Sequence, residues 1–246
     1  TAALCLCVAG LVSQSSAHAE DNFQSRPRTA NIIPVETADQ WFAQGASTAI
    51  ARGASRARAK NIILFVGDGM SLPTVAAARI YEGQSRGQSG EENQLSFETM
   101  PYSGLSKTYN TDSQTPDSAG TMTAMMTGIK TRKGMLSIDQ TSNRSNCEQS
   151  RNAGLATGFE LAEIAGMSTG IVSTTSLTHA TPAATYAHTP ERTWENDSDL
   201  PKTAVSAGCR DIARQFVDFN FGDGIEVALG GGRLHFTPAD TIDPEY

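Results

Sequence analysis

The sequence predicts an α/β protein in which helices pack on a mostly parallel β-sheet. Short apolar runs of strand length alternate along the chain with segments of helical pattern, and the turns between them are short. One of these runs, residues 61–66 (NIILFV), is continuously apolar, as expected for a strand that is buried on both faces. The chain has 246 residues, enough for one large domain with its own core, and no internal repeat is found.

The individual elements follow from local signals in chain order. Residues 20–58 are polar and irregular, and we expect an arm there with one helix at 38–44. The strand at 61–66 ends at two glycines that flank Asp68, and Ser71 can cap the next helix, with Pro73 tolerated in its first turn. The other expected elements are a helix at 71–81, a loop at 83–93, a strand at 105–109, helices at 118–127 and 159–165, a strand at 170–175, a helix at 211–219 and a strand at 225–229.

Charge and composition exclude several classes of protein. The formal net charge is −7 and the isoelectric point is near 5.1, so a general binder of nucleic acid or of anionic membranes is disfavoured. Glycine and proline number 22 and 10, close to the average share, which excludes collagen-like and low-complexity chains. Beyond the first residues there is no run of 18 apolar residues, so we expect no transmembrane helix in this sequence.

The first residues have the pattern of an export signal. Residues 2–12 (AALCLCVAGLV) form an apolar run that is too short to span a bilayer. The triplet Ala17-His18-Ala19 that follows is a small-x-small site of the kind that signal peptidase accepts. We therefore expect residues 1–19 to be a signal peptide with a truncated start, and the mature protein to be secreted or periplasmic. A buried N-terminal helix is the alternative.

Cysteine usage is compatible with export. Removal of the signal leaves Cys147 and Cys209 as one even pair. In an oxidising compartment these residues can bridge a long loop, which would stabilise the fold by about 4 kcal/mol in the chain-entropy description. Two free buried thiols are equally compatible with the sequence.

Asp68 is the first candidate for a functional side chain. It directly follows the apolar run 61–66, at the place where reactive groups collect beyond the carboxyl ends of parallel strands. The flanking glycines allow a ligand to approach closely, and a carboxylate there suits a cation such as Mg²⁺ or Zn²⁺. An aspartate that makes a turn or caps the next helix is the alternative.

Ser118, in the segment TPDSAGT, is the second candidate. It lies at the start of the expected helix 118–127, where free N–H groups and the helix dipole favour an anion or a developing alkoxide. No histidine is near in sequence to act as its base, so a nucleophilic role would need a metal ion. A simple N-cap serine is the alternative.

The segment THATP follows the expected strand at 170–175 and places an imidazole and a hydroxyl, those of His179 and Thr181, at the edge of the sheet. Taken alone, His179 is equally compatible with a structural role. Arg192 offers a bidentate fork for phosphate, with a surface charge as the alternative. His188 and His235 show no partner that the sequence identifies.

These motifs together, in the order NIILFVGDGM, TPDSAGTMTAMMTG and THATPAATYAH with Arg192, resemble the alkaline phosphatase family from about Lys60 to the last residue. The resemblance implies a three-layer α/β/α sandwich with a mostly parallel central sheet. It also implies a phosphomonoesterase that hydrolyses small phosphate monoesters through a phosphoserine intermediate, with two zinc ions and one magnesium ion. A homodimer is expected by the same resemblance.

The resemblance also implies a role for each motif residue. Ser118 matches the nucleophile, and Asp68 matches the carboxylate shared between the second zinc site and the magnesium site. Thr181 matches a magnesium ligand. Arg192 matches the arginine that binds two phosphate oxygens, and Asp117 matches the residue that helps to orient this arginine.

Further details resemble the animal-type members of the family. His179 occupies a position where some members carry aspartate and animal-type enzymes carry histidine, so it is expected to border the magnesium site. Cys147 and Cys209 fall where those enzymes form a disulfide. Glu245, in the segment DPEY, falls on a ligand of their additional calcium site.

The remaining zinc ligands of the family come from a C-terminal half that these residues do not include. Residues 59–246 are therefore expected to be the N-terminal part of a single catalytic domain, and residues 20–246 alone are expected not to catalyse. Two alternatives remain open. One is another enzyme of the same metal-dependent superfamily, such as a phosphodiesterase or a sulfatase. The other is a secreted phosphate- or metal-binding module without turnover, against which Ser118 and Arg192 argue.

Overall fold

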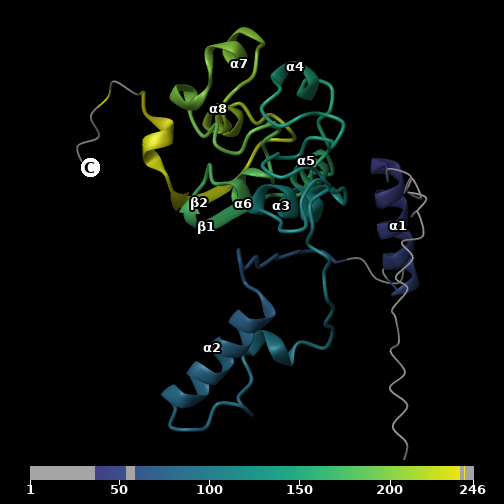
Figure 1. Cartoon of the computed structure of the whole chain (residues 1–246), viewed down its shortest axis with the longest axis vertical. Helices are drawn as coiled ribbons and strands as arrows, with labels where there is room; N and C mark the ends of the chain where they lie inside the picture. Colours follow the sequence, from purple (N-terminus) through teal and green to yellow (C-terminus); the bar gives the residue numbers. More distant parts are fainter. Residues whose placement is uncertain (1–36, 54–58, 239–240, 242–246) are drawn as a thin grey trace, which may run out of the picture. The chain divides into compact units, whose positions relative to one another are not determined.

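The computed structural model describes residues 37–53, 59–238 and 241 (Figure 1). The expected signal peptide at 1–19, most of the expected arm at 20–58 and the expected calcium ligand Glu245 lie outside the described residues. No helix in the described ranges is both long enough and apolar enough to cross a bilayer.

The helix expected in the arm is present as α1, Ala38–Ala51, and is longer than the predicted 38–44. Thr37 caps it: its hydroxyl accepts from the backbone N–H of Gln40, and the Gln40 side chain accepts from the backbone N–H of Thr37. The next helix, α2, is Leu72–Ser85, with Ser71 at its N-cap and proline in its first turn as predicted. It extends into the predicted loop at 83–93, and a short 3-10 helix, η2, follows at Ser96–Thr99.

Two predicted strands are wrong. In the described part of the chain, residues 61–66 and 105–109 have no regular secondary structure and belong to no β-ladder. The side chains of Ile63, Phe65 and Leu105 are 80%, 88% and 85% exposed. The apolar pattern is that of a strand, but a strand also needs a neighbouring backbone that accepts and donates its ladder hydrogen bonds, and the described residues provide none here.

The predicted parallel pairing is confirmed for the two described strands. β1, Gly170–Ser176, pairs in parallel with β2, Val227–Gly231, so that Val172 lies opposite Leu229. Figure 1 shows the two strands side by side. The connection between them contains the short elements α6 at Ala180–Ala183, η3 at Asp197–Asp199, α7 at Lys202–Ser206 and α8 at Ile212–Val217, and η4 at Arg233–Phe236 follows β2.

The helices that precede β1 begin and end where the sequence signals lie. α3, Ser118–Thr127, ends at Gly128, which has a φ of 75° and therefore closes the helix in the left-handed conformation that glycine tolerates. α5, Gly158–Ile164, begins after Thr157, which forms a reciprocal cap with Glu160. The short helix α4, Cys147–Ser150, was not predicted.

The core forms where these helices meet the sheet. Helix α3 packs against α5 and α6, and α6 packs against β1. The main cluster of buried side chains comprises Ala119, Met122, Leu136, Ile171, Ala180, Ala183, Ala184, Tyr186, Ala187 and Ile212. A second cluster surrounds Trp194 and contains a disulfide between Cys147 and Cys209, the pairing that the family resemblance implied. The disulfide joins α4 to the residues that follow α7.

Candidate active site

Asp68 binds two hydroxyl groups that are distant from it in sequence. Its Oδ2 atom accepts hydrogen bonds from the Ser118 Oγ and the Thr181 Oγ1, each at 2.9 Å. Ser118 is the first residue of α3, and Thr181 lies in α6, the two helices that pack together. The neighbouring residue Val66 packs against the main core cluster. The three candidates from three separate motifs therefore meet at one carboxylate oxygen.

The first turn of α3 corrects the reading of Ser118 as an N-cap. The N-cap is Asp117, whose carboxylate accepts from the backbone N–H of Gly120 at 3.2 Å. Because Asp117 has this role, the Ser118 hydroxyl is not used to cap the helix and points instead to Asp68. The Ser118 hydroxyl is therefore free of any capping role, and it lies at the N-terminus of a ten-residue helix, where the helix dipole is positive.

Arg192 is held at the same place by two groups. Its Nη1 donates to the Asp117 Oδ2 at 3.1 Å, and its Nη2 lies 3.2 Å from the His179 Nε2. The His179 Nδ1 accepts from the backbone N–H of Thr181, so this ring connects α6 to the guanidinium group. The side chain of Arg192 is 24% exposed, which keeps its charge partly shielded but reachable.

The carboxylate of Asp117 is surrounded by donors. The backbone N–H groups of Gly120 and Gly134, the side-chain amide of Asn110 and the guanidinium of Arg192 all point to it. Burial would raise the pKa of Asp117, but these hydrogen bonds outweigh it and lower the pKa. Asp117 therefore remains a charged acceptor that fixes one side of Arg192.

Asp68 is likewise ionised at neutral pH. Its partial burial would raise its pKa, whereas the hydrogen bonds from Ser118 and Thr181 lower it more. The positive charge of Arg192 adds to this effect, and the pKa of Asp68 is lowered overall. A carboxylate with a lowered pKa is a good cation ligand but a weak base toward a serine hydroxyl.

The oxygen atoms around Asp68 fit a hard cation. One carboxylate and the hydroxyls of Ser118 and Thr181 converge there, and Mg²⁺ commonly binds one or two carboxylates while it keeps several waters. The donor set does not fit a zinc site, which takes three or four N, S or O ligands. Within the described ranges, no three or more His, Cys, Asp and Glu residues gather in a metal-binding group.

Two histidines without partners in the sequence have partners in the structure. The His188 Nε2 lies 2.7 Å from the Glu160 Oε1, and its Nδ1 lies 3.0 Å from the Ser137 carbonyl oxygen. The His235 Nε2 lies 3.2 Å from the Glu195 Oε2. The partners are 28 or more residues away along the chain, and no local pattern signals such pairs.

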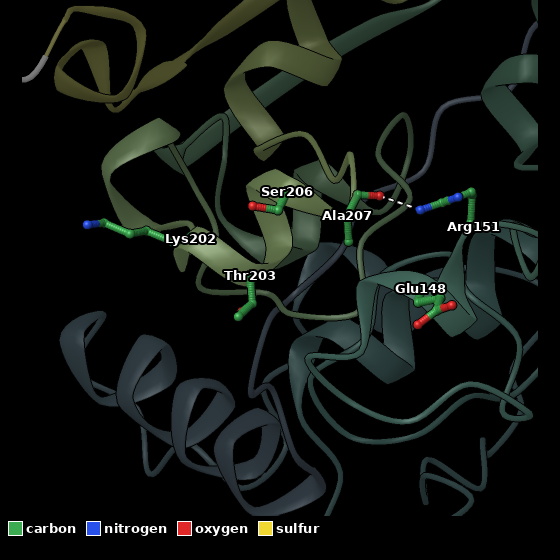
Figure 2. Close-up of a pocket in the computed structure, with 6 residues that line it drawn as sticks. All are labelled: Glu148, Arg151, Lys202, Thr203, Ser206 and Ala207. Atoms are coloured by element: carbon green, nitrogen blue, oxygen red, sulfur yellow. Dashed lines mark hydrogen bonds between the residues drawn. The ribbon is translucent and has the colours of Figure 1, made fainter.

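A surface hollow beside α4 and α7 does not contain the site. Figure 2 shows the side chains that line it: Glu148, Arg151, Lys202, Thr203, Ser206 and Ala207. Arg151 donates from its Nη2 to the carbonyl oxygen of Ala207. The hollow borders α4 and α7 near the disulfide, and it brings none of the sequence-predicted catalytic residues together.

Known proteins match most of this chain. The family model described as alkaline phosphatase matches residues 59–246. An alkaline phosphatase of Gadus morhua is 48% identical over 189 residues, which make up 77% of this chain and 39% of that protein. The tissue-nonspecific isozyme of Homo sapiens is 45% identical over 188 residues, or 76% of this chain and 36% of that protein. The chain thus spans about two fifths of the length of the curated relatives it matches.

Solved structures give the same result for the fold. The crystal structure of Thermus thermophilus alkaline phosphatase has a TM-score of 0.55 and 30% sequence identity, and the match covers 77% of this chain and 36% of that one. A cold-active alkaline phosphatase from Shewanella sp. has a TM-score of 0.51 and 28% identity, with 71% and 36% of the two chains covered. The α/β fold and the family predicted from the motifs are confirmed: the chain belongs to the alkaline phosphatase family.

Proposed function

We propose that this chain carries the nucleophile and the phosphate-binding arginine of a phosphomonoesterase. The observation that carries the proposal is the convergence of Ser118, Asp68 and Arg192, from three separate segments, around the N-terminus of α3. An anion is favoured at this helix end, and the guanidinium group adds a fork suited to phosphate oxygens. The membership of the alkaline phosphatase family supports the same substrate class.

The geometry suits a double displacement at phosphorus. The Arg192 Nη1 and Nη2 each carry two N–H groups; one N–H of Nη1 points to Asp117, so N–H groups remain on both nitrogens to bind phosphate oxygens. The Ser118 Oγ attacks phosphorus, and the P–O bond to the ester oxygen breaks as the new bond forms. The Ser118 hydroxyl releases its proton to solvent as it attacks, and the leaving alkoxide takes up a proton from solvent, so the number of protons is unchanged. Water then attacks the phosphoserine, which releases inorganic phosphate and restores the Ser118 hydroxyl.

Asp68 and Thr181 are the residues that would hold a magnesium ion, with His179 at its border. A divalent cation at Asp68 would lower the pKa of the Ser118 hydroxyl and offset the charge of the phosphate. The Ser118 proton points to the Asp68 Oδ2 before attack, and Asp117 keeps Arg192 in place. The two zinc ions and the calcium ion implied by the family resemblance need ligands beyond the described residues, so we derive no step from them.

The proposal extends to where the protein works. An N-terminal export signal at 1–19 and a disulfide between Cys147 and Cys209 both favour an oxidising, extracytoplasmic location. We propose a secreted or periplasmic enzyme that acts as a homodimer on small phosphate monoesters. A phosphodiesterase of the same superfamily, or a binding module without turnover, is the competing function.

The first prediction concerns Ser118. The protein expressed from its entire reading frame, mixed briefly with labelled inorganic phosphate and quenched in acid, should carry the label on the peptide that contains Asp117, Ser118 and Ala119. Ser118→Ala should abolish the label and lower kcat by about three orders of magnitude or more, because the Ser118 Oγ is the atom that attacks phosphorus in the proposed reaction. Metal content should change little.

Ser113→Ala is the matched control. Its hydroxyl donates to the carbonyl of Thr115, a few residues before the nucleophile, and does not contact Asp68. This variant should keep the label and near-normal kcat. Label on a threonine would indicate a phosphodiesterase, and a wild-type protein that binds phosphate without label or turnover would indicate a binding module.

A further inference from the structure

The segment that carries Arg192 is held by backbone hydrogen bonds to an earlier loop. Thr189 and Leu136 exchange two of them, N to O, at 3.0 and 2.9 Å. The Arg192 N–H donates to the Gly134 carbonyl at 2.8 Å, and the Ser145 N–H donates to the carbonyl of Pro190 at 2.9 Å. Loop 132–145 therefore supports segment 188–193 at residues 189, 190 and 192, although the two are about 50 residues apart.

The residue before Arg192 adds a charged contact to this support. Glu191, which is 6% exposed, receives a two-pronged interaction from Arg144: Nε to Oε2 and Nη2 to Oε1, both at 2.7 Å. The hydroxyl of Ser145 donates to the Oε2 at 2.8 Å, and the backbone N–H of Thr193 donates to the Oε1 at 3.3 Å. Both carboxylate oxygens of Glu191 are thus used, by Arg144 and Ser145 of the loop and by Thr193, the residue after Arg192.

Arg144 also lies against Gly134, the residue that is hydrogen-bonded to both Asp117 and Arg192. Gly134 donates its N–H to the Asp117 Oδ2 at 3.0 Å and accepts from the Arg192 N–H. A Cβ on Gly134 would collide with the Nε and Cζ of Arg144, so the guanidinium packs directly on this glycine. Gly134 has a φ of 82°, which independently favours glycine.

The backbone of Ser145 is consistent with a tightly fixed loop. It has a φ of 61°, a conformation that residues other than glycine seldom adopt. Such a conformation persists where the surroundings hold it, and both the N–H and the hydroxyl of Ser145 bind segment 190–191. The unusual backbone of Ser145 is therefore in direct contact with the buried carboxylate of Glu191, the residue before Arg192.

We propose that the ion pair of Arg144 with Glu191 is a positioning device for Arg192. Neither residue touches Ser118 or Asp68 among the described contacts. Instead, the pair fixes the backbone on both sides of Arg192 and presses on Gly134, through which Asp117 and Arg192 are aligned. The inference rests on the proposed function, since it assigns a role in the placement of the phosphate-binding guanidinium.

The test is a double-mutant cycle on the protein expressed from its entire reading frame. The readouts are the inhibition constant for inorganic phosphate, kcat and KM for an aryl phosphate, and the midpoint of thermal unfolding. Arg144→Ala should weaken phosphate inhibition about tenfold, and Glu191→Gln should act similarly. In an Arg192→Ala background, Arg144→Ala should cause no further loss, because its effect on phosphate passes through Arg192.

Two further variants keep the test decisive. Arg144→Lys retains the charge but loses the two-pronged contact, so it should fold and show an intermediate loss of phosphate inhibition. Arg214→Ala breaks an exposed ion pair with Asp218 on α8 and should leave phosphate inhibition unchanged. If Arg144→Ala and Arg144→Lys leave phosphate inhibition unchanged, or Arg144→Ala weakens it equally with and without Arg192, the positioning role is wrong. If Arg192→Ala itself has no effect on phosphate inhibition, the proposed function fails instead.

Discussion

Residues 110–219 and residues 59–109 lie in the same family match, but their apolar side chains differ in solvent exposure. The large side chains with under 2% exposure, Met135, Leu136, Ile138 and Ile212, all lie in the first region of the described chain. In the second region, apolar residues such as Ile63, Phe65 and Leu105 are at least 80% exposed. The candidate site draws on both, since Asp68 comes from the second region and Ser118, Thr181 and Arg192 come from the first.

The difference teaches which part of the site is preorganised. Ser118, Asp117 and Arg192 are fixed by helix α3, by the support from Gly134 and by a packed core. Asp68 is held by its two hydrogen bonds and by Val66, two residues earlier, which joins the core. The residues Ser118, Asp117 and Arg192 therefore have a scaffold in the packed region, while Asp68 depends on fewer contacts.

The largest expected effect in the packed region comes from its disulfide. Replacement of Cys147 and Cys209 by serine should lower the free energy of unfolding by about 4 kcal/mol, because the bridge closes a loop of 62 residues in the unfolded chain. Chemical denaturation of the oxidised protein and of the double variant measures this difference. A loss below about 1 kcal/mol would mean that the packed region does not depend on the bridge.

A pair of leucines tests the comparison directly. Leu136 is fully buried, so Leu136→Ala should cost about 2–5 kcal/mol of unfolding free energy. Leu105 is 85% exposed, so Leu105→Ala should change stability by less than about 0.5 kcal/mol. Denaturant titration of the two variants gives both values. Equal losses would show that residues 59–109 are packed in solution and would overturn the contrast between the regions.

The smallest effect concerns the pH dependence of the packed region. Burial would lower the pKa of His188, but the hydrogen bond and charge of Glu160 and the carbonyl of Ser137 outweigh it and raise the pKa. The ion pair therefore contributes fully below the unfolded value of about 6.5 and is lost as pH rises through the higher folded value.

In His188→Gln this part of the pH dependence should disappear. Unfolding free energies measured from pH 5.5 to 9 should fall less steeply in the variant than in the wild type, by at most the slope of one proton. A wild-type curve that is parallel to that of the variant would show that His188 does not change its charge linkage on folding.

Local sequence signals predicted α3, α5 and the strand pair well, whereas the short helices α4, α6 and α7 were not predicted. Gly128 ends α3, Thr157 and Glu160 start α5, and β1 and β2 pair in parallel as expected. These features depend on a few neighbouring residues, or on a pattern that every parallel sheet shares. The motif residues were also found by sequence, and the structure brings Asp68, Asp117, Ser118, His179, Thr181 and Arg192 into one connected set of hydrogen bonds.

What the sequence did not reveal depends on contacts between distant segments. The strand predicted at 61–66 has the right residues but no partner among the described ones, and no local pattern reports a partner. The pairs of His188 with Glu160 and of Arg144 with Glu191 are 28 and 47 residues apart. Charged residues are common on surfaces, so only the fold distinguishes these buried pairs from solvated side chains.

During synthesis on the ribosome, β1 can pair with β2 only after the residues between the two strands have been made. Thr169, just before β1, donates its N–H to a glutamate 57 residues downstream, just before β2. The contacts of α3 with α6 and of loop 132–145 with segment 188–193 can form as soon as Arg192 has emerged. At a synthesis rate of roughly 5–20 residues per second, the 57 residues between Thr169 and its partner take roughly 3–11 s to synthesise. During that interval the open edge of β1 is exposed to other nascent chains and is a natural target for chaperones.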